Sequence, residues 1–175
     1  MLDDALIEQL RRLLTSVEQI LPRSVPAIDW ESCLAANWRR HSFAGYLEPL
    51  AAIDDIDLDD LIGIDAQKKI VDDNTRQFLG GYPANNILLW GSRGTGKSSV
   101  VRALLTRYGK QGLRIIQVDK DDIPSLPDIF AAIEKLPYRY LIFCDDLSFE
   151  PSEKSYKILK SALDGSVYAA PANTL

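Results

Sequence analysis

Apolar positions in the first part of the chain recur at spacings typical of amphipathic helices. Leucines, valine and isoleucine between residues 2 and 21 form one apolar stripe at helical spacing, and Pro22 and Pro26 end this predicted helix. A second short helix is predicted for about residues 29–40, with Trp30, Leu34 and Trp38 on one side. We expect these tryptophans to pack the helix pair onto the main body, and the alternative is a surface that binds a partner protein.

The pattern changes after residue 45 and divides the chain into three parts. Residues 45–60 are acidic and aliphatic and have no helical period, so they are predicted to be loop-like. We therefore predict an N-terminal helical segment at residues 1–45, a linker at residues 46–60 and a main domain at residues 61–175.

Helical and strand-like patterns alternate through the main domain. The strand pattern at residues 140–144 is short and continuously apolar, as expected where helices cover both faces of a sheet. This alternation predicts an α/β fold of three layers, α/β/α, around a mainly parallel sheet. The predicted elements are helices at 65–79, 97–108, 126–136 and 154–163 and strands at 86–90, 113–118 and 140–144.

Composition limits the classes of function. The chain has 175 residues, of which 46% are hydrophobic and 26% charged, which is ordinary for a globular protein. A net charge of −5 argues against nucleic acid as a partner. No apolar run approaches the roughly 20 residues of a membrane span, and no signal peptide is visible, so we expect a cytoplasmic protein. The two cysteines, Cys33 and Cys144, are too few for a disulfide framework, and the single histidine, His41, is expected at the surface.

Residues 91–98 fit the phosphate-binding pattern G-x-x-x-x-G-K-[ST] at every fixed position. Glycines let the loop turn tightly and bring backbone N–H groups against phosphate oxygens, and the following helix directs its positive end at the same anion. Lys97 is expected to reach the β- and γ-phosphates, and the Ser98 hydroxyl to bind Mg²⁺. A glycine turn without a ligand is the alternative, but an apolar run before the loop and a helix after it favour a nucleotide. The candidate contacts are Gly91, Ser92, Arg93, Gly94, Thr95, Gly96, Lys97, Ser98 and Ser99.

Two aspartates follow the last predicted strand. In open α/β folds, ligands bind at the carboxyl edge of the sheet, where Asp145 is expected to hold Mg²⁺ as a Walker-B aspartate does. Asp146 is the candidate that orients or deprotonates an attacking water and, with Lys97, completes the predicted catalytic pair. Alternatively, the two carboxylates cap the next helix.

Together, the loop and the segment Leu141–Asp146 resemble the P-loop ATPases of the AAA+ superfamily. Leu61–Asp65 looks like the adenine-pocket segment of that superfamily, so Ile62 and Gly63 become candidate nucleotide contacts. The sequences of residues 83–91, 118–122 and 143–150 further resemble an uncharacterised bacterial family of ATP-binding proteins, a domain of unknown function. This resemblance implies ATP and Mg²⁺ as cofactors and homo-oligomeric rings, but no cellular task.

The chain departs from the superfamily pattern in two places. Asp146 stands where most members have glutamate, so water positioning could be weaker, or Glu150 could contribute. The chain also stops at Leu175, where a fourth strand with a polar sensor is expected to begin, before the arginine finger and helical lid. In the AAA+ sheet this strand lies between the Walker-A and Walker-B strands. Either the sequence is a fragment or another strand fills the gap, and we expect a fragment.

Two other functions stay open. A P-loop kinase or GTPase would place the two Walker strands side by side, but Asp119–Asp122 lacks the asparagine of the guanine-recognition signature Asn-Lys-x-Asp. A non-enzymatic ATP-regulated adaptor would bind a protein partner through its N-terminal helices, including Trp30 and Trp38. The leading prediction is Mg²⁺-dependent ATP binding, with hydrolysis in the intact protein.

Overall fold

A four-stranded sheet forms the centre of the molecule in the computed structural model. The strands lie in the order β2-β1-β3-β4; β1 pairs antiparallel with β2 and parallel with β3, which pairs parallel with β4. The bounds are β1 (Ala35–His41), β2 (Ala44–Pro49), β3 (Leu113–Gln117) and β4 (Arg139–Phe143). The predicted α/β class with a mostly parallel sheet is confirmed. The structure describes residues 7–9, 11–12, 27–41, 44–51, 53–145, 147 and 170–175.

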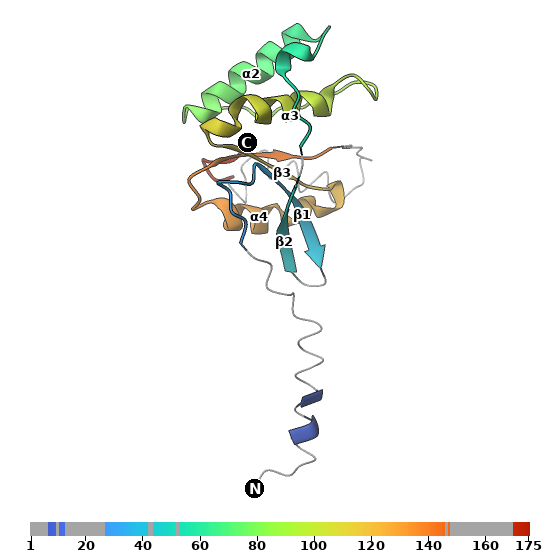
Figure 1. Ribbon diagram of the computed structural model, residues 1–175, viewed down its shortest axis with the longest axis vertical. Coiled ribbons are helices and arrows are strands. Elements are labelled where there is room, and N and C mark those ends of the chain that lie inside the picture. The colour runs from blue at the N-terminus through green and yellow to red at the C-terminus, as the bar shows by residue number, and fades with distance from the viewer. Residues whose placement is uncertain are drawn as a thin grey trace.

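Helices lie on both sides of this sheet. Figure 1 shows α2 and α3 on one side and α4 on the other, which gives the three predicted layers. The long helices are α2 (Asp65–Leu79), α3 (Lys97–Tyr108) and α4 (Leu126–Ile133). Three short 3₁₀ helices connect the layers: η1 (Leu58–Asp60), η2 (Gly109–Gln111) and η3 (Lys120–Ser125).

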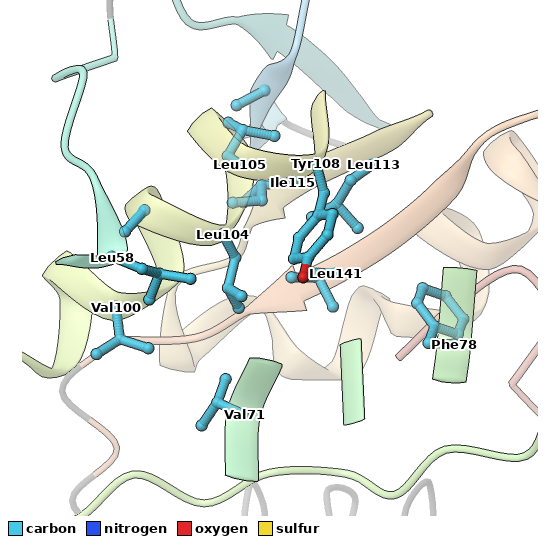
Figure 2. Close-up of a cluster of buried hydrophobic side chains, with 12 residues drawn as sticks. Leu58, Val71, Phe78, Val100, Leu104, Leu105, Tyr108, Leu113, Ile115 and Leu141 are labelled. Carbon is cyan, nitrogen blue, oxygen red and sulfur yellow. The ribbon is translucent and has the colours of Figure 1, made fainter. Parts of the chain in front are cut away.

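Two apolar clusters hold the layers together, one on each face of the sheet. The first joins α2, α3 and η1 to β3 and β4, and Figure 2 shows its side chains, including Val71, Phe78, Leu104 and Tyr108. The second joins β1, β3 and β4 to α4 through residues such as Ile116 and Ile129. Removal of this apolar surface from water is the main favourable term that fixes the layer arrangement.

The predicted helix at residues 29–40 is wrong, because residues 35–41 form strand β1 in the middle of the sheet. Spacings of four residues, such as Leu34 to Trp38, fit an alternating strand as well as a helix. Pairing with β2 on one side and β3 on the other decided the conformation. The predicted linker is also partly wrong, since β2 spans residues 44–49 and the predicted boundary between residues 45 and 46 falls inside it.

The predicted strand at residues 86–90 is also wrong, because this segment joins no ladder. Its neighbour Asn85 is held instead by the Asn74 side chain, which accepts from the Asn85 N–H at 2.9 Å and donates to its carbonyl at 2.8 Å. Leu88 is 74% and Trp90 87% exposed. An apolar run becomes a buried strand only beside a partner strand, and no described segment pairs with this one.

Residues 173–175 add a short parallel segment to the outer side of β4. Tyr140 N donates to Asn173 O at 2.8 Å, and Leu175 N donates to Tyr140 O at 2.9 Å. Ile142 N donates to Leu175 O at 2.8 Å. These residues lie where the AAA+ resemblance places the start of the fourth strand.

Several predictions fall wholly or partly outside the described residues. Of the predicted helix at 2–21, only residues 7–9 and 11–12 are described, and they are helical. The predicted helix at 154–163 lies outside, as do Asp146 and Glu150. Within the described part of the chain, no helix has the length and apolar character needed to cross a membrane.

Candidate functional site

The loop at residues 91–98 follows the exposed segment 86–90 and leads directly into α3. Gly91, Gly94 and Gly96 all have positive φ, at 139°, 82° and 85°. Residues with a Cβ rarely adopt these conformations, so both glycines that the motif fixes, Gly91 and Gly96, lie where the backbone needs glycine, and Gly94 is a third such position. No backbone N–H between residues 92 and 96 donates a hydrogen bond to another described residue.

The amino end of α3 lies at the end of this loop. Gly96 is its N-cap in the left-handed conformation, and no side chain caps the first turn. The first N–H groups of a helix have no partner inside the helix and carry the positive end of its dipole. The loop and this helix end therefore present backbone donors to an anion.

Lys97 and Thr95 fold back on the loop. Lys97 Nζ donates to Gly91 O at 3.0 Å and to Ser92 O at 2.9 Å, and Thr95 Oγ1 donates to Ser92 O at 2.9 Å. The ammonium thus lies inside the curve of the loop, where a bound oxyanion would replace two neutral carbonyls as its partners. Bonds between two charged groups are stronger than bonds to neutral acceptors, so this exchange favours the anion.

The loop is joined to the end of β4 by one hydrogen bond. Ser98 Oγ donates to Asp145 Oδ2 at 2.8 Å, and both side chains are half-buried. The two residues are 47 positions apart in the sequence. A hydroxyl and a carboxylate at this separation are hard oxygen ligands of the kind that Mg²⁺ takes in phosphate sites.

Acidic groups dominate the electrostatics next to this pair. Burial raises the pKa of the Cys144 thiol to about 11, and the nearby carboxylates of Asp119 and Asp145 contribute to the same shift. The thiol is therefore protonated at neutral pH and is not a nucleophile. Asp119 follows β3 as Asp145 follows β4, so both carboxylates lie at the carboxyl edge of the sheet.

The segment at residues 61–65 lies beside the loop, but through a different residue from those predicted. A Cβ placed on Gly96 would lie 3.6 Å from Ile64 Cδ1. The predicted contact Ile62 is 92% exposed, and Gly63 has a positive φ of 81° with open space around it. Ile64 was not among the predicted nucleotide contacts, because its place beside Gly96 depends on a tertiary contact that sequence spacing does not show.

The remaining predicted site residues differ in how far the structure places them. Arg93 is exposed at the loop tip, and Ser99 is half-buried in the first turn of α3. The candidate catalytic residue Asp146 lies outside the described residues, so its role stays a prediction. The structure brings together the loop, Ser98 and Asp145, with Ile64 beside them.

These features define an α/β domain with a phosphate-type loop at the carboxyl edge of its sheet. A family model described as "Protein of unknown function (DUF815)" matches residues 31–175. The chain belongs to this family. Neither the search of curated proteins nor the search of solved structures found a match.

Proposed function

We propose that this protein binds ATP with Mg²⁺ through its glycine loop, as a P-loop protein of the AAA+ type. The observation that carries the proposal is the 2.8 Å hydrogen bond between Ser98 Oγ and Asp145 Oδ2. It joins the two motifs that a nucleotide–magnesium site requires, although they are far apart in the sequence. A glycine turn with no ligand gives no reason for a carboxylate to lie at this hydroxyl.

Each part of the site has a role in this proposal. The N–H groups of the loop and of the first turn of α3 bind phosphate oxygens, and Lys97 contributes a point charge to them. Ser98 and Asp145 hold Mg²⁺, which neutralises phosphate charge when it is bound. Ile62 and Gly63 contribute to the adenine contact, and Ile64 is added to them because it lies beside Gly96.

Equilibrium binding of ATP and GTP, each with and without Mg²⁺, tests the class of ligand. The proposal expects ATP to bind more tightly than GTP and Mg²⁺ to strengthen ATP binding. AMP, which lacks the β- and γ-phosphates, is the matched control and is expected to bind far more weakly. A clear preference for GTP would contradict the adenine assignment and favour a GTPase. Equal binding of ATP and AMP would contradict the role of the loop.

ATP hydrolysis is part of the same proposal, with Asp146 as the group that orients or deprotonates the attacking water. The Asp146→Asn substitution keeps the size of the side chain but removes its basic carboxylate. It is expected to leave ATP affinity within about twofold and to lower turnover by about 10²-fold or more, the usual contribution of a general base. Phosphate release measured under saturating ATP is the assay. An unchanged rate would place the catalytic base elsewhere, and ATP binding without any turnover would favour the adaptor.

Homo-oligomeric assembly belongs to the same proposal, because AAA+ proteins act as rings. Light scattering of the protein with and without Mg²⁺-ATP measures the mass of the assembly directly. A mass increase that depends on ATP is expected. A monomer under both conditions would remove assembly from the proposal but would not affect nucleotide binding.

A further inference from the structure

A buried arginine lies at the opposite edge of the sheet from the glycine loop. Arg114, the second residue of β3, is only 4% exposed. One of its hydrogen bonds goes to Gly109 in η2, the short helix that follows the carboxyl end of α3. The glycine loop precedes the amino end of α3. At 1.5 Å per residue, the twelve residues of α3 separate these two places by about 18 Å.

Within the part of the chain that the structure describes, only neutral groups bind the Arg114 guanidinium. Nε donates to Trp30 O at 2.7 Å, and Nη1 donates to Gly109 O at 2.8 Å and to Leu113 O at 2.7 Å. The Tyr138 ring lies against the same group, with its centroid 4.2 Å from Cζ. Among the described residues, no carboxylate lies within ion-pair distance of Arg114. A buried cation with no anionic partner is uncommon, because the cost of desolvating the charge is then only partly offset.

One amino group of the guanidinium, Nη2, is left for a ligand. Nη2 has no acceptor among the described residues, and it is not one of the fully buried unsatisfied atoms. It is therefore in contact with solvent. Arg114 also lines a pocket of about 330 Å³, together with Glu31, Leu34, Lys110 and Tyr138.

The charges of this pocket match a monoanion. Arg114 and Lys110 each contribute one positive charge, and Glu31 contributes one negative charge. The net charge of +1 would be neutralised by a single carboxylate, whereas a phosphate dianion would leave an excess of negative charge.

We propose that this pocket, here named the Arg114 pocket, binds a carboxylate group at a site separate from the nucleotide site. Its carboxylate accepts from Arg114 Nη2 and is attracted by the Lys110 ammonium at the rim. The carboxylate belongs either to a small free acid or to an acidic side chain of a peptide. This proposal is independent of nucleotide binding, since the Arg114 pocket and the glycine loop share no residue.

The Nε–H resonance of Arg114 in a ¹⁵N-correlated NMR spectrum reports on this pocket directly. Its proton is buried and hydrogen-bonded to Trp30 O, so its exchange with water is slow enough for detection. The full chain is titrated with acetate, with N-acetyl-glutamate amide and with its neutral match N-acetyl-glutamine amide. Chloride is exchanged to keep the ionic strength constant, because salt screens such contacts. A saturating shift is expected for one or both carboxylates and none for the neutral compound.

Two surface substitutions that leave the buried arginine unchanged are expected to shift acetate affinity in opposite directions. Lys110→Gln is expected to weaken acetate binding about two- to fivefold, and Glu31→Gln is expected to strengthen it by a similar factor, since exposed charge pairs have energies of this order. Both side chains are exposed, so neither change is expected to alter the fold.

The outcomes separate the possible sources of the carboxylate. If only acetate gives a saturating shift, the ligand is a small free acid. If N-acetyl-glutamate amide gives one as well, the pocket also accepts the acidic side chain of a peptide. The proposal would be overturned if the shifts rose linearly with the concentration of every compound and were the same in both variants as in the wild type. Arg114 would then have only the structural role of linking Trp30 and Gly109 by hydrogen bonds. Stronger binding of inorganic phosphate than of either carboxylate would also overturn it.

Discussion

The hydrogen bond between Ser98 and Asp145 predicts a measurable coupling between the two motifs. Ser98→Ala and Asp145→Ala each remove one partner, and the double substitution removes both. A hydrogen bond to a charged group contributes roughly 1.5–3 kcal/mol to stability. Because both side chains are only half-buried, we expect a coupling at or slightly below the lower end of this range, about 1–2 kcal/mol.

Urea unfolding of the wild type, the two single variants and the double variant, without nucleotide, measures this coupling as a double-mutant cycle. For a chain of this length, 1 kcal/mol corresponds to roughly 2–4 °C in Tm, so thermal unfolding gives a second reading. Ser98→Ala combined with Asp128→Ala is the matched control, because Asp128 is exposed in the first turn of α4 and does not contact Ser98. This control pair is expected to be additive.

A coupling below about 0.5 kcal/mol for Ser98 and Asp145 would refute the reasoning, because independent sites agree with additivity within roughly that margin. The two motifs would then be neighbours without forming a joint site. A coupling of the expected size, together with loss of the Mg²⁺ effect on ATP binding in Ser98→Ala, would tie the bond to the metal site.

Three further substitutions test the loop, the core and the sheet. Gly96→Ala is expected to destabilise the protein by about 1–2 kcal/mol, because φ is +85° there, and to weaken ATP binding; equal affinity in calorimetry would contradict the anion role of the loop. Gly45→Ala is expected to cost about 1–3 kcal/mol or more in urea unfolding, since the new Cβ would lie 1.8 Å from a Trp38 ring atom, and an unaffected midpoint would contradict this contact. Tyr108→Phe removes the 2.6 Å bond to Asp72 and is expected to cost about 1–2 kcal/mol at neutral pH. Burial and that bond raise the pKa of Tyr108 to about 12, so between pH 10 and 12 the tyrosine of the unfolded chain ionises while that of the folded protein stays neutral. The free energy of unfolding of the wild type is therefore expected to fall toward that of Tyr108→Phe over this pH range. A difference between the two that stays constant with pH would contradict the pKa shift.

The helices and strands of the main domain could be predicted from the sequence where local signals agree with packing. The bounds of α2 and α3 match the prediction, because Gly80 and the glycine loop mark their ends and an apolar stripe marks their buried face. Strands β3 and β4 were also predictable, since their short apolar runs are too short for helices.

Tertiary pairing decided the conformation of the segments that were predicted wrongly. Residues 35–41 have a pattern compatible with either conformation, and only their position between β2 and β3 makes them a strand. Residues 86–90 have the composition of a strand, but no described partner is available to pair with them. Both cases depend on contacts with segments distant in sequence, which a local pattern does not contain.

The glycine loop could be predicted in nearly complete form, because its motif fixes both residue type and spacing. The proximity of Ser98 and Asp145 followed from the general rule that ligand groups gather at the carboxyl edge of a parallel sheet. The buried position of Arg114 could not be predicted, since a charged residue within a strand gives no directional signal.

Binding of Mg²⁺-ATP to Lys97→Ala tests the central claim most directly. Lys135→Ala is the matched control, because Lys135 is exposed beyond the end of α4. Calorimetric titration of wild type and both variants is expected to show at least about tenfold weaker binding for Lys97→Ala, the equivalent of losing one charged hydrogen bond, and no change for Lys135→Ala. Equal affinity of wild type and Lys97→Ala would contradict the proposal that the loop at residues 91–98 binds the phosphates of ATP.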